Sequence, residues 1–314
     1  MVPYNLPSCV NNLTSVTDAI DGVEAGVETF TYDKLNRVER ITQEGNGVAE
    51  KRVDMTYDAA SQLKQVQRYS DLAGTQSVAD TVYDYDIAGR LESLTHQQGA
   101  TIIADYGFVY DKANRLTQLT TPDGLSDYTY NNRNELTSGD HSYQTNETYD
   151  YDATGNRTNT GYSTGDHNRL LGDGTYTYEY DNEGNRIRRT ETATGEVTEY
   201  TWDFRNRLTQ VETKDASGTV IQTVEYVYDV YDRRLAKIVD PDGAGGLTPE
   251  EERFVYDGGH IALVFDGAGN QTHRYLHGPQ IDQRQFDDDY KIAGGSTVNT
   301  LGSKSREGFW GRYV

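Results

Sequence analysis

A short sequence unit recurs along most of the 314-residue chain. The dipeptide Tyr-Asp occurs 11 times, whereas about 2.5 occurrences are expected if the two residue types pair at random. One anchor aromatic per unit gives ten anchors with a mean spacing of about 25 residues, which lies within the range of repeat architectures. The anchors are Tyr32, Tyr57, Tyr85, Tyr110, Tyr130, Tyr151, Tyr180, Trp202, Tyr228 and Tyr256.

Each unit has the pattern of a β-hairpin. Residues 30–32 alternate in character and lead into Asp33, three turn residues, Arg37 and a second alternating segment. Alternation of Thr, Tyr, Val and Leu with a period of two is typical of half-buried strands. Asp at the start of a turn can hydrogen-bond the backbone two residues on, and Gly or Asn before the Arg tolerates a positive φ. No stretch shows sustained helical periodicity.

These hairpins predict an all-β fold. A single hairpin is only marginally stable in water, so ten or more in series are expected to pair edge to edge. We predict one long continuous antiparallel sheet of hairpin repeats, which strand twist curves into a spiral that forms an open or partial hollow shell. One face carries the anchor aromatics together with Leu, Val and Ile. Variable insertions are expected at residues 44–51, 70–80 and 240–252.

Composition excludes several classes of protein. Only 35% of residues are hydrophobic and mean hydropathy is −0.80. The 25 Tyr residues, however, each contribute a large apolar ring with a single polar hydroxyl. The net charge of −21 argues against a nucleic-acid partner. No apolar run approaches the ~20 residues of a membrane-spanning helix, and residues 1–10 show no secretion signal. The single Cys9 excludes an internal disulfide framework and a zinc cluster.

The repeat resembles a known family. The pattern Tyr-Asp-x-x-Gly-Arg-Leu-x-x-Leu-Thr, as at residues 85–95, is similar to the Rhs/YD-repeat family of bacterial Rhs proteins, insecticidal toxin-complex C components, wall-associated proteins and teneurins. The resemblance covers residues 12–282, and residues 274–283 look like the run that introduces the terminal core module of bacterial members. It implies a β-sheet that spirals into a hollow shell, which encloses a C-terminal effector domain in toxin-bearing members.

The chain departs from this family pattern in three ways. Residues 12–17 read as the outgoing strand of a unit whose incoming strand is missing, and residues 284–314 match no part of the repeat. The aspartate-containing self-cleavage motif of toxin-bearing members is absent, and no effector domain follows. We therefore expect a YD-repeat domain at residues 1–283 and an atypical tail at residues 284–314, in a piece of a larger shell or a truncated gene product.

The recurring residues have a functional and a structural interpretation. The Asp and Arg of each unit could form a polar ladder that binds sugars or ions, and the Tyr row could stack on sugar rings. We favour the structural interpretation, in which each Asp caps its turn and each Arg fork bonds the neighbouring hairpin. The Tyr row is then the packing of the sheet itself.

An acidic segment was compared with the calcium-binding loop of EF-hands. Asp240, Asp242, Gly245 and Glu251 fall at loop positions one, three, six and twelve. Ala244 stands at position five, where an oxygen ligand is expected, and the flanking segments have the pattern of strands. An acidic loop between hairpins is therefore favoured over a calcium site.

No other pattern indicates chemistry. His273 and His277 are four residues apart, which suits a metal only on a helix, whereas in the predicted strand they are about 13 Å apart along the axis. No Ser, His and acid set, nucleophile elbow or phosphate-binding loop is present. We predict no catalytic, cofactor-binding or metal-ligating residues and no cofactor.

The function predicted from the sequence is a non-enzymatic scaffold or encapsulating shell segment without an effector domain. One alternative is a cell-surface or extracellular binding module for a glycan or a partner protein. A third hypothesis is a carbohydrate-active enzyme, which needs a cleft with two carboxylates ~5–10 Å apart. Exposed sheet edges near residues 12 and 283 predict pairing with a second copy or with the rest of a larger shell, and an effector polypeptide is a further candidate partner. The resemblance implies secretion or surface display.

Overall fold

The computed structural model describes residues 12–20, 22–243, 245–278 and 284–289. These residues form 24 strands and one short 3-10 helix, η1, at Asp166–Asn168. The strands build two 12-stranded sheets, and the chain divides into two compact units between residues 148 and 149. The predicted all-β class is therefore confirmed. Within the described residues, no helix combines the length and apolar character needed to cross a bilayer.

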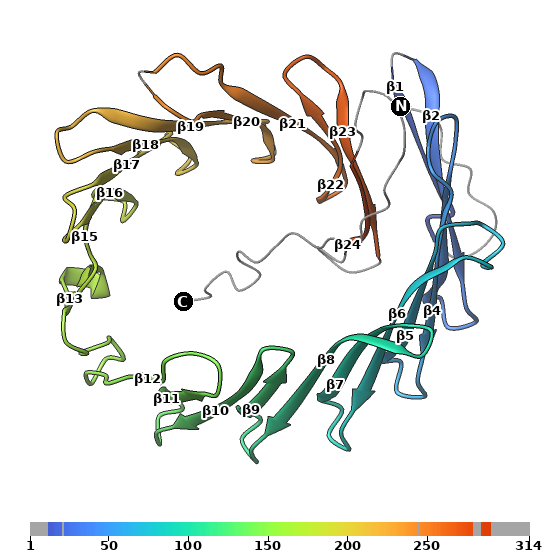
Figure 1. Ribbon diagram of the computed structural model, residues 1–314, viewed down its shortest axis with the longest axis horizontal. Helices are drawn as coiled ribbons and strands as arrows, with labels where there is room; N and C mark the ends of the chain where they lie inside the picture. Colours follow the sequence, from blue (N-terminus) through green and yellow to red (C-terminus); the bar gives the residue numbers. More distant parts are fainter. Residues whose placement is uncertain (1–11, 21, 244, 279–283, 290–314) are drawn as a thin grey trace. The chain divides into compact units, whose positions relative to one another are not determined.

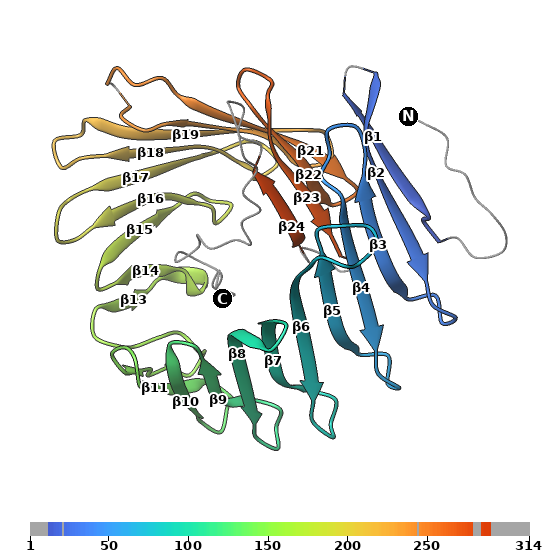
Figure 2. The ribbon, with the colours of Figure 1, turned by 45° about the vertical axis from the view of Figure 1, so that its right-hand side comes forward.

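The first sheet contains β1 to β12 in sequence order, with each strand hydrogen-bonded antiparallel to the next. Figures 1 and 2 show β1 to β8 following one another side by side. The strands are β1 (Ser15–Ile20), β2 (Val23–Tyr32), β3 (Val38–Glu44), β4 (Lys51–Tyr57), β5 (Leu63–Tyr69), β6 (Ser77–Tyr85), β7 (Leu91–Gln98), β8 (Thr101–Tyr110), β9 (Leu116–Thr121), β10 (Gly124–Tyr130), β11 (Leu136–His141) and β12 (Glu147–Thr148).

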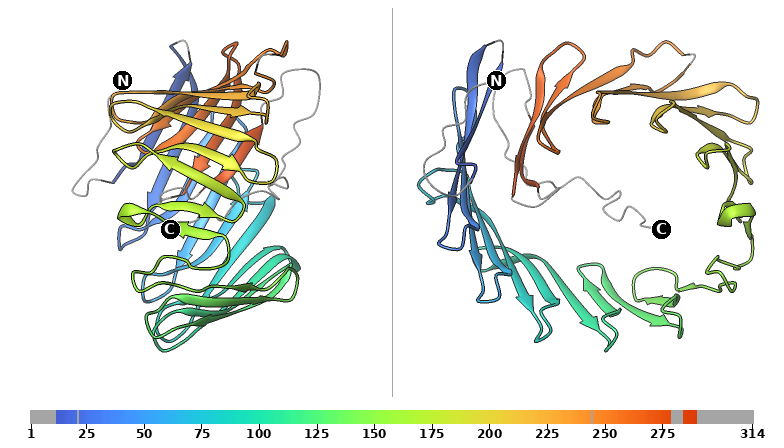
Figure 3. Two further views of the ribbon diagram at one scale, coloured as in Figure 1. Left: turned by 90° about the vertical axis from the view of Figure 1, so that its left-hand side faces the viewer. Right: turned by 180° about the vertical axis from the view of Figure 1, so that it is seen from behind.

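The second sheet repeats this arrangement with β13 to β24, again antiparallel and in sequence order. Figure 3 shows its successive hairpins stacked from green to orange. The strands are β13 (Tyr162–Thr164), β14 (Leu170–Asp173), β15 (Tyr176–Tyr180), β16 (Arg186–Glu191), β17 (Val197–Trp202), β18 (Leu208–Lys214), β19 (Val220–Tyr228), β20 (Arg234–Asp240), β21 (Glu250–Asp257), β22 (His260–Asp266), β23 (Gln271–His277) and β24 (Arg284–Asp289).

Consecutive pairing places the Tyr-Asp turns of a sheet at the same ends of its strands, along a border of the sheet that we call the turn edge. Because every connection is a hairpin, successive connections alternate between the two edges of the sheet. Residues 33–37 join β2 to β3 and residues 58–62 join β4 to β5, both at the same edge. The opposite edge carries the predicted insertions, since residues 45–50, 70–76 and 241–249 join one hairpin to the next.

The anchor face of each sheet is the face that carries the anchor aromatics. In β4, Val53 and Met55 are buried on the same side as Tyr57, whereas Thr56 between them is exposed. Val66 lies directly opposite Met55 on β5 and is also buried. The predicted alternation with a period of two is therefore confirmed in these strands.

One feature differs from the predicted continuous sheet. The ladder of paired strands is interrupted between β12 and β13, so the chain forms two sheets instead of one. No Val, Leu, Ile, Met or Phe occurs between Leu136 and Leu170. A hairpin in this segment has few aliphatic side chains to pack, and the repeat there is reduced to an isolated bridge between Tyr151 and Arg157.

The end of the second sheet extends past the predicted repeat domain. Strand β24 pairs antiparallel with β23, so residues 284–289 continue the sheet. Residues 290–314 of the predicted tail, residues 279–283 and Cys9 lie outside the described residues. The boundary at residue 283 stays a prediction.

Candidate functional site: a ladder of turns along each sheet

Most repeats contribute a five-residue turn that an aspartate closes, as at residues 33–37. Asp33 Oδ1 accepts hydrogen bonds from the backbone N–H groups of Leu35 at 2.8 Å and Arg37 at 3.0 Å. Asp33 Oδ2 accepts a bond from Arg37 Nε at 2.7 Å. Asn36 has a φ of 61°, a conformation that Asn and Gly adopt at little cost. The predicted turn chemistry is therefore confirmed.

The arginine of one turn supports the tyrosine of the next unit. Arg37 Cζ lies 4.4 Å from the ring centroid of Tyr57, which is a cation–π contact. The Tyr57 hydroxyl donates a hydrogen bond to the backbone oxygen of Val38 at 2.7 Å. The same stacking, at 4.7–5.2 Å, joins Arg90 to Tyr110, Arg115 to Tyr130, Arg207 to Tyr228 and Arg233 to Tyr256.

The hydrogen bond from an anchor aromatic to the preceding unit recurs in both sheets. The acceptor is the backbone oxygen of the residue directly after the preceding turn, at 2.6–3.0 Å. The donor–acceptor pairs are Tyr57–Val38, Tyr85–Leu63, Tyr130–Leu116, Tyr180–Leu170, Trp202–Arg186, Tyr228–Leu208 and Tyr256–Arg234. The anchor row therefore ties successive hairpins together through hydrogen bonds, which the sequence did not predict.

Arginine also bonds the next turn directly. Arg90 Nη1 donates to the backbone oxygen of Asp111 at 3.0 Å and to Asn114 Oδ1 at 2.8 Å. Arg115 makes the same two types of contact with the turn that follows it. The fork geometry of the guanidinium lets one side chain close its own turn and hold the next.

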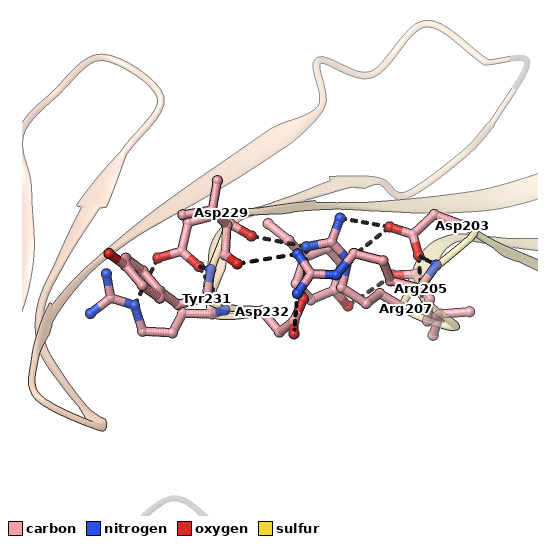
Figure 4. A network of polar contacts seen from close by, with 10 residues as sticks. Asp203, Arg205, Arg207, Asp229, Tyr231 and Asp232 are labelled. Carbon is pink, nitrogen blue, oxygen red and sulfur yellow. Dashed lines mark hydrogen bonds and ion pairs between the residues drawn. The ribbon is translucent and has the colours of Figure 1, made fainter.

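Figure 4 shows one link of this ladder in the second sheet. Arg207 pairs with Asp203 of its own turn at 2.7 Å and with Asp232 of the next turn at 3.0 Å. Arg205 pairs with the other carboxylate oxygen of Asp232 at 2.8 Å. Two arginines of one turn therefore share a carboxylate of the next turn.

Some turns use a different closing residue. Gln62 stands at the arginine position of its turn, and its Nε2 donates to the backbone oxygen of Gly89 in the next turn at 2.7 Å. Glu135 stands at the same position in a later turn and accepts a bond from Asn131 Nδ2 at 2.5 Å. The side-chain closing bond is therefore kept in the Asn131–Glu135 turn with its donor and acceptor exchanged, whereas the Gln62 side chain bonds the next turn.

Three turns of the second unit close with asparagine, at Asn156, Asn185 and Asn270. Asn185 Nδ2 donates to Asp181 Oδ2 at 2.9 Å and to Asn206 Oδ1 of the next turn at 2.9 Å. Asn156 makes the equivalent bonds to its own turn and the next. The neutral amide thus reproduces the two hydrogen bonds that arginine makes elsewhere.

The sequence patterns missed one turn, at residues 165–169. The backbone N–H of Gly165 donates to the backbone oxygen of Arg169 at 2.8 Å, which is the bond that closes the other turns. Arg169 Cζ lies 5.7 Å from the Tyr180 ring centroid of the next unit. Glycine occupies the aspartate position and Thr164 the anchor position, so a search for Tyr-Asp could not find this turn. The run Asn-Arg-Leu at residues 168–170 was the remaining signal.

The ladder's hydrogen bonds set the protonation states of its members. The bond from the backbone N–H of Arg37 lowers the pKa of the Asp33 carboxyl, and the bond from the Arg90 side chain lowers the pKa of Asp86. Burial raises the pKa of the Tyr57 hydroxyl. At neutral pH the carboxylates therefore act as acceptors and the hydroxyls as donors.

The candidate calcium loop uses its carboxylates within the protein. Asp240 and Asp242 accept hydrogen bonds from backbone N–H groups of their own loop at 3.0 and 3.1 Å. Glu251, at calcium position twelve, lies in β21 and pairs with Arg253 at 2.7 Å. Ala244 lies outside the described residues.

The two histidines of β23 make separate contacts. His277 Nε2 lies 2.8 Å from the backbone oxygen of Ile261, and its ring stacks on His260 with a centroid distance of 4.6 Å. The His273 ring packs against Tyr275 at 5.8 Å. Among the residues that the structure describes, no three His, Cys, Asp or Glu side chains are grouped to hold a metal ion.

The sheet register brings together a serine and a histidine that the sequence did not indicate. Ser126 Oγ lies 2.8 Å from His141 Nδ1 and 3.1 Å from the Tyr143 hydroxyl. Glu147 Oε2 lies 3.9 Å from His141 Nε2. Ser126 is 0% exposed, so its hydroxyl is closed to a substrate carbonyl in this conformation. The contact is a cross-strand pair between β10 and β11.

An acidic groove of about 530 Å³ lies along β21 to β23. Its lining includes Glu251, Glu252 and Asp266, so it is where a carboxylate pair of a glycosidase would be sought. Glu251 pairs with Arg253, Glu252 pairs with Lys237 at 3.5 Å, and Asp266 accepts bonds from its own turn. These carboxylates are therefore engaged in structural contacts.

An antiparallel meander whose hairpins are linked by a ladder of Tyr, Asp and Arg defines a YD-repeat sheet protein. The Teneurin YD-shell family matches residues 9–123, and the RHS Repeat family matches residues 110–140. Residues 9–140 of the chain are therefore similar to Rhs/YD-repeat family segments.

Individual relatives share only the repeat region. The chain is 31% identical over 112 residues to "Probable deoxyribonuclease RhsB" of Dickeya dadantii, which covers 35% of this chain and 6% of the relative. It is 33% identical over 141 residues to "Double-stranded DNA deaminase toxin A" of Burkholderia cenocepacia, which covers 42% of this chain and 9% of the relative. The chain thus spans less than a tenth of the length of these relatives.

Two similar solved structures are toxin complexes. The crystal structure of TcdB2-TccC3-Cdc42 aligns with 84% of this chain and 18% of the chain compared, at 14% identity and a TM-score of 0.43. A Tc holotoxin pore of Photorhabdus luminescens aligns with 84% of this chain and 17% of its own, at 14% identity and a TM-score of 0.42.

Proposed function

We propose that this chain is a non-enzymatic structural segment of a larger Rhs-like shell. The observation that carries the proposal is the ladder, because the residues that recur in every unit bond their own turn and the neighbouring unit. Arg207, for example, contacts Asp203, Asp232 and Tyr228, which belong to two successive units. The family matches support the proposal, since they fall on repeat and shell segments.

The partners and location follow from this role. The remainder of a larger shell and an effector polypeptide are the partners we propose, with secretion or surface display as the setting. The deoxyribonuclease and deaminase activities in the relatives' names belong to those proteins, of which the matched segment is 6% and 9%. We propose that this chain forms part of the wall of the shell and has no catalytic role.

Small-angle X-ray scattering together with cryo-electron microscopy of the protein tests the shell role. A compact chain of this length has a radius of gyration of about 20 Å. A curved wall with an uncovered face gives a clearly larger value and a hollow in the reconstruction. A radius near 20 Å with both faces of each sheet covered would contradict the proposal.

The terminal strands provide the surfaces for assembly. Within the described residues, β1 is bonded to β2 alone and β13 to β14 alone, so each has one unpaired edge. Unpaired strand edges are templates for pairing with another chain. We propose that the protein self-associates through such edges. Light scattering should show a mass that rises with concentration, and a constant monomer mass at high concentration would overturn this part of the proposal.

A second candidate function is a binding module. The turn edge of the second sheet exposes Phe204 (93%), Val230 (74%) and Tyr231 (76%) at the tips of two adjacent turns. Exposed aromatic side chains on rigid turns are suitable contacts for a glycan or a protein. A glycan array screened with the protein and with the double variant Phe204→Ser, Tyr231→Ser tests this function. Binding that the variant loses supports it, and no binding to any glycan counts against the glycan form.

A further inference from the structure

Three arginines of the second unit occupy a position that is aliphatic elsewhere. In the first unit, the residue directly after the turn is Leu or Val and lies at the start of the outgoing strand. In the second unit this position holds Arg157, Arg186 and Arg234. The aliphatic residues at the equivalent position are Val38, Leu63, Leu91, Leu116, Leu136, Leu170 and Leu208.

Each of these arginines lies on an aromatic ring of its own hairpin. Arg186 Cζ is 4.4 Å from the ring centroid of Tyr178, and Arg157 Cζ is 3.9 Å from that of Tyr149. Both rings belong to the residue two positions before an anchor, so these arginines are on the anchor face. Stacking holds the guanidinium plane against the ring and leaves its edges as hydrogen-bond donors.

Arg186 has a second arginine beside it. Arg189 stacks on Tyr176 at 4.5 Å, and the rings of Tyr176 and Tyr178 are 6.4 Å apart. Tyr178 donates its hydroxyl to Asp173 Oδ2 at 2.6 Å, which fixes the ring that supports Arg186. The two guanidiniums therefore form a rigid pair on the face of β15 and β16.

Arg234 forms a second site further along the same sheet. Its guanidinium lies 5.5 Å from the Tyr226 ring and 5.2 Å from the Phe254 ring, so it is held by rings of β19 and β21. Strands β16 and β20 are four strand spacings apart, which corresponds to about 19 Å.

Within the part of the chain that the structure describes, Arg186, Arg189 and Arg234 lack the carboxylate partner that most turn arginines have. The turn arginines pair with aspartates, and Arg188, on the other face of β16, lies 3.9 Å from Glu179. Among the described residues, no carboxylate forms an ion pair with Arg186, Arg189 or Arg234. The Nε atoms of Arg186 and Arg234 are buried without a hydrogen-bond partner, as is that of Arg188, and Arg189 Nη2 donates to Thr198 Oγ1 at 3.2 Å. In a chain of charge −21 with 50 acidic residues, arginines on one face without a carboxylate partner need an explanation.

We propose that the anchor face of the second sheet binds the carboxylates of an extended acidic polypeptide, at Arg186 with Arg189 and at Arg234. Arginine forks bind carboxylates in a bidentate geometry. An extended chain spans the ~19 Å between the two sites with about six residues. This inference is independent of the shell role.

Single-stranded nucleic acid fits this face less well. Its bases need open aromatic rings for stacking, and here the rings of Tyr176 and Tyr178 are covered by guanidiniums. The net charge of −21 also opposes a phosphate backbone. The same overall charge repels an acidic peptide, so measurable binding of such a peptide requires a local site.

Fluorescence anisotropy of a labelled ten-residue polyglutamate peptide at 50 mM NaCl tests the proposal. The intact protein should bind the peptide saturably, and 500 mM NaCl should weaken binding because the contacts are ionic. The variant Arg186→Gln, Arg234→Gln should lose at least tenfold in affinity, since two charge-assisted contacts are removed. The matched control Arg188→Gln, on the opposite face, should change affinity less than twofold.

Two further measurements keep the test decisive if the double variant is destabilised. The single variant Arg189→Gln, compared with the intact protein by circular dichroism and thermal melting, should keep the fold and still lose affinity. An Arg186→Lys variant should bind more weakly than the intact protein, because lysine keeps the charge but lacks the fork. No saturable binding, an equal loss in Arg188→Gln, or tighter binding of a ten-residue oligothymidylate would overturn the proposal.

Discussion

The two units of this protein close the repeat turn with different sets of residues, since arginine closes turns in both and asparagine closes further turns in the second. In the first unit, Arg90 bonds Asp86 of its own turn and Asn114 of the next, at 2.7 and 2.8 Å. In the second unit, Asn185 bonds its own turn and the next at 2.9 Å each. The comparison teaches that the turn needs a donor that reaches two oxygen atoms, and that a positive charge is not required.

Two of the turns that asparagine closes differ from the other turns in where the nearby arginine stands. In the turns that Asn156 and Asn185 close, arginine stands one residue later, on the anchor face, as Arg157 and Arg186 do. Turn arginines take part in the ladder of both units, and the second unit in addition has arginine directly after some turns. The two units therefore share one turn geometry but differ in the side chains that follow the turn on the anchor face.

Acid should weaken both types of turn together, and this is the largest effect we expect. Hydrogen bonds from the side chains of Arg90 and Asn156 lower the pKa of Asp86 and of Asp152, respectively. Because the folded pKa lies below the unfolded value of about 3.9, the stabilisation is complete above that value and is lost as the pH falls through the folded pKa. The urea midpoint should fall steadily below about pH 4.

Hydrogen exchange with mass spectrometry separates the two units in that experiment. Peptides from Arg-closed and Asn-closed turns should lose protection in the same acidic range. At neutral pH, 1 M NaCl should increase exchange more at Arg-closed turns, because it screens their ion pairs. Protection of Asn-closed turns that does not change with acid would show that Asp152 is not needed in its ionised form.

Truncation of the buried face should have the next largest effect. Ile41 on β3 is 0% exposed, and Ile41→Ala should lower the free energy of unfolding by about 2–5 kcal/mol. In the second sheet, Ile187 is 37% exposed, and Ile187→Ala should cost less than about 1 kcal/mol. Urea denaturation measures both. Equal losses would contradict the assignment of the buried face.

The positive-φ position should be equally strict in the two units. Gly89 in an Arg-closed turn has a φ of 77°, and Gly184 in an Asn-closed turn has a φ of 91°. Each Gly→Ala change should cost about 1–2 kcal/mol, because an L-residue is strained there. Asn114→Gly at the equivalent position serves as the control and should change stability by less than about 0.5 kcal/mol. A cost at only one glycine would mean that the two turn types differ in backbone geometry.

Exchange of the closing residue should have the smallest effect. Arg90→Asn keeps the type of hydrogen bonds seen at Asn185 and removes the cation–π contact with Tyr110, so it should cost about 0.5–1 kcal/mol. Arg90→Leu removes the closing bonds as well and should be clearly more destabilising by urea denaturation. If both variants lose the same stability, the asparagine turn is not an equivalent of the arginine turn.

The sequence predicted the turns because their determinants are local. Aspartate, the positive-φ residue and arginine act within five consecutive positions, as at Asp33, Asn36 and Arg37. The bond from an arginine to the neighbouring hairpin was also predictable, because the unit repeats and its neighbour is the next unit. The donor role of the anchor hydroxyl depends on the strand stagger and was seen only in the structure.

The features that the sequence did not predict depend on missing or distant signals. The interruption after β12 follows from the lack of aliphatic residues over a long segment, while Tyr-Asp dipeptides continue through it. The turn at residues 165–169 lacks both signature residues. The pairing of Ser126 with His141 depends on the register of two strands, which neither residue reveals alone.

The central claim is that anchor hydroxyls bond each unit to the one before it. Tyr228 donates to the Leu208 backbone oxygen at 2.8 Å, whereas Tyr231, three residues later, is 76% exposed at the turn tip. The most direct test is the free energy of unfolding of Tyr228→Phe and Tyr231→Phe, measured side by side. We predict a loss of about 1 kcal/mol for Tyr228→Phe and less than about 0.5 kcal/mol for Tyr231→Phe. Equal values for the two variants would contradict the claim.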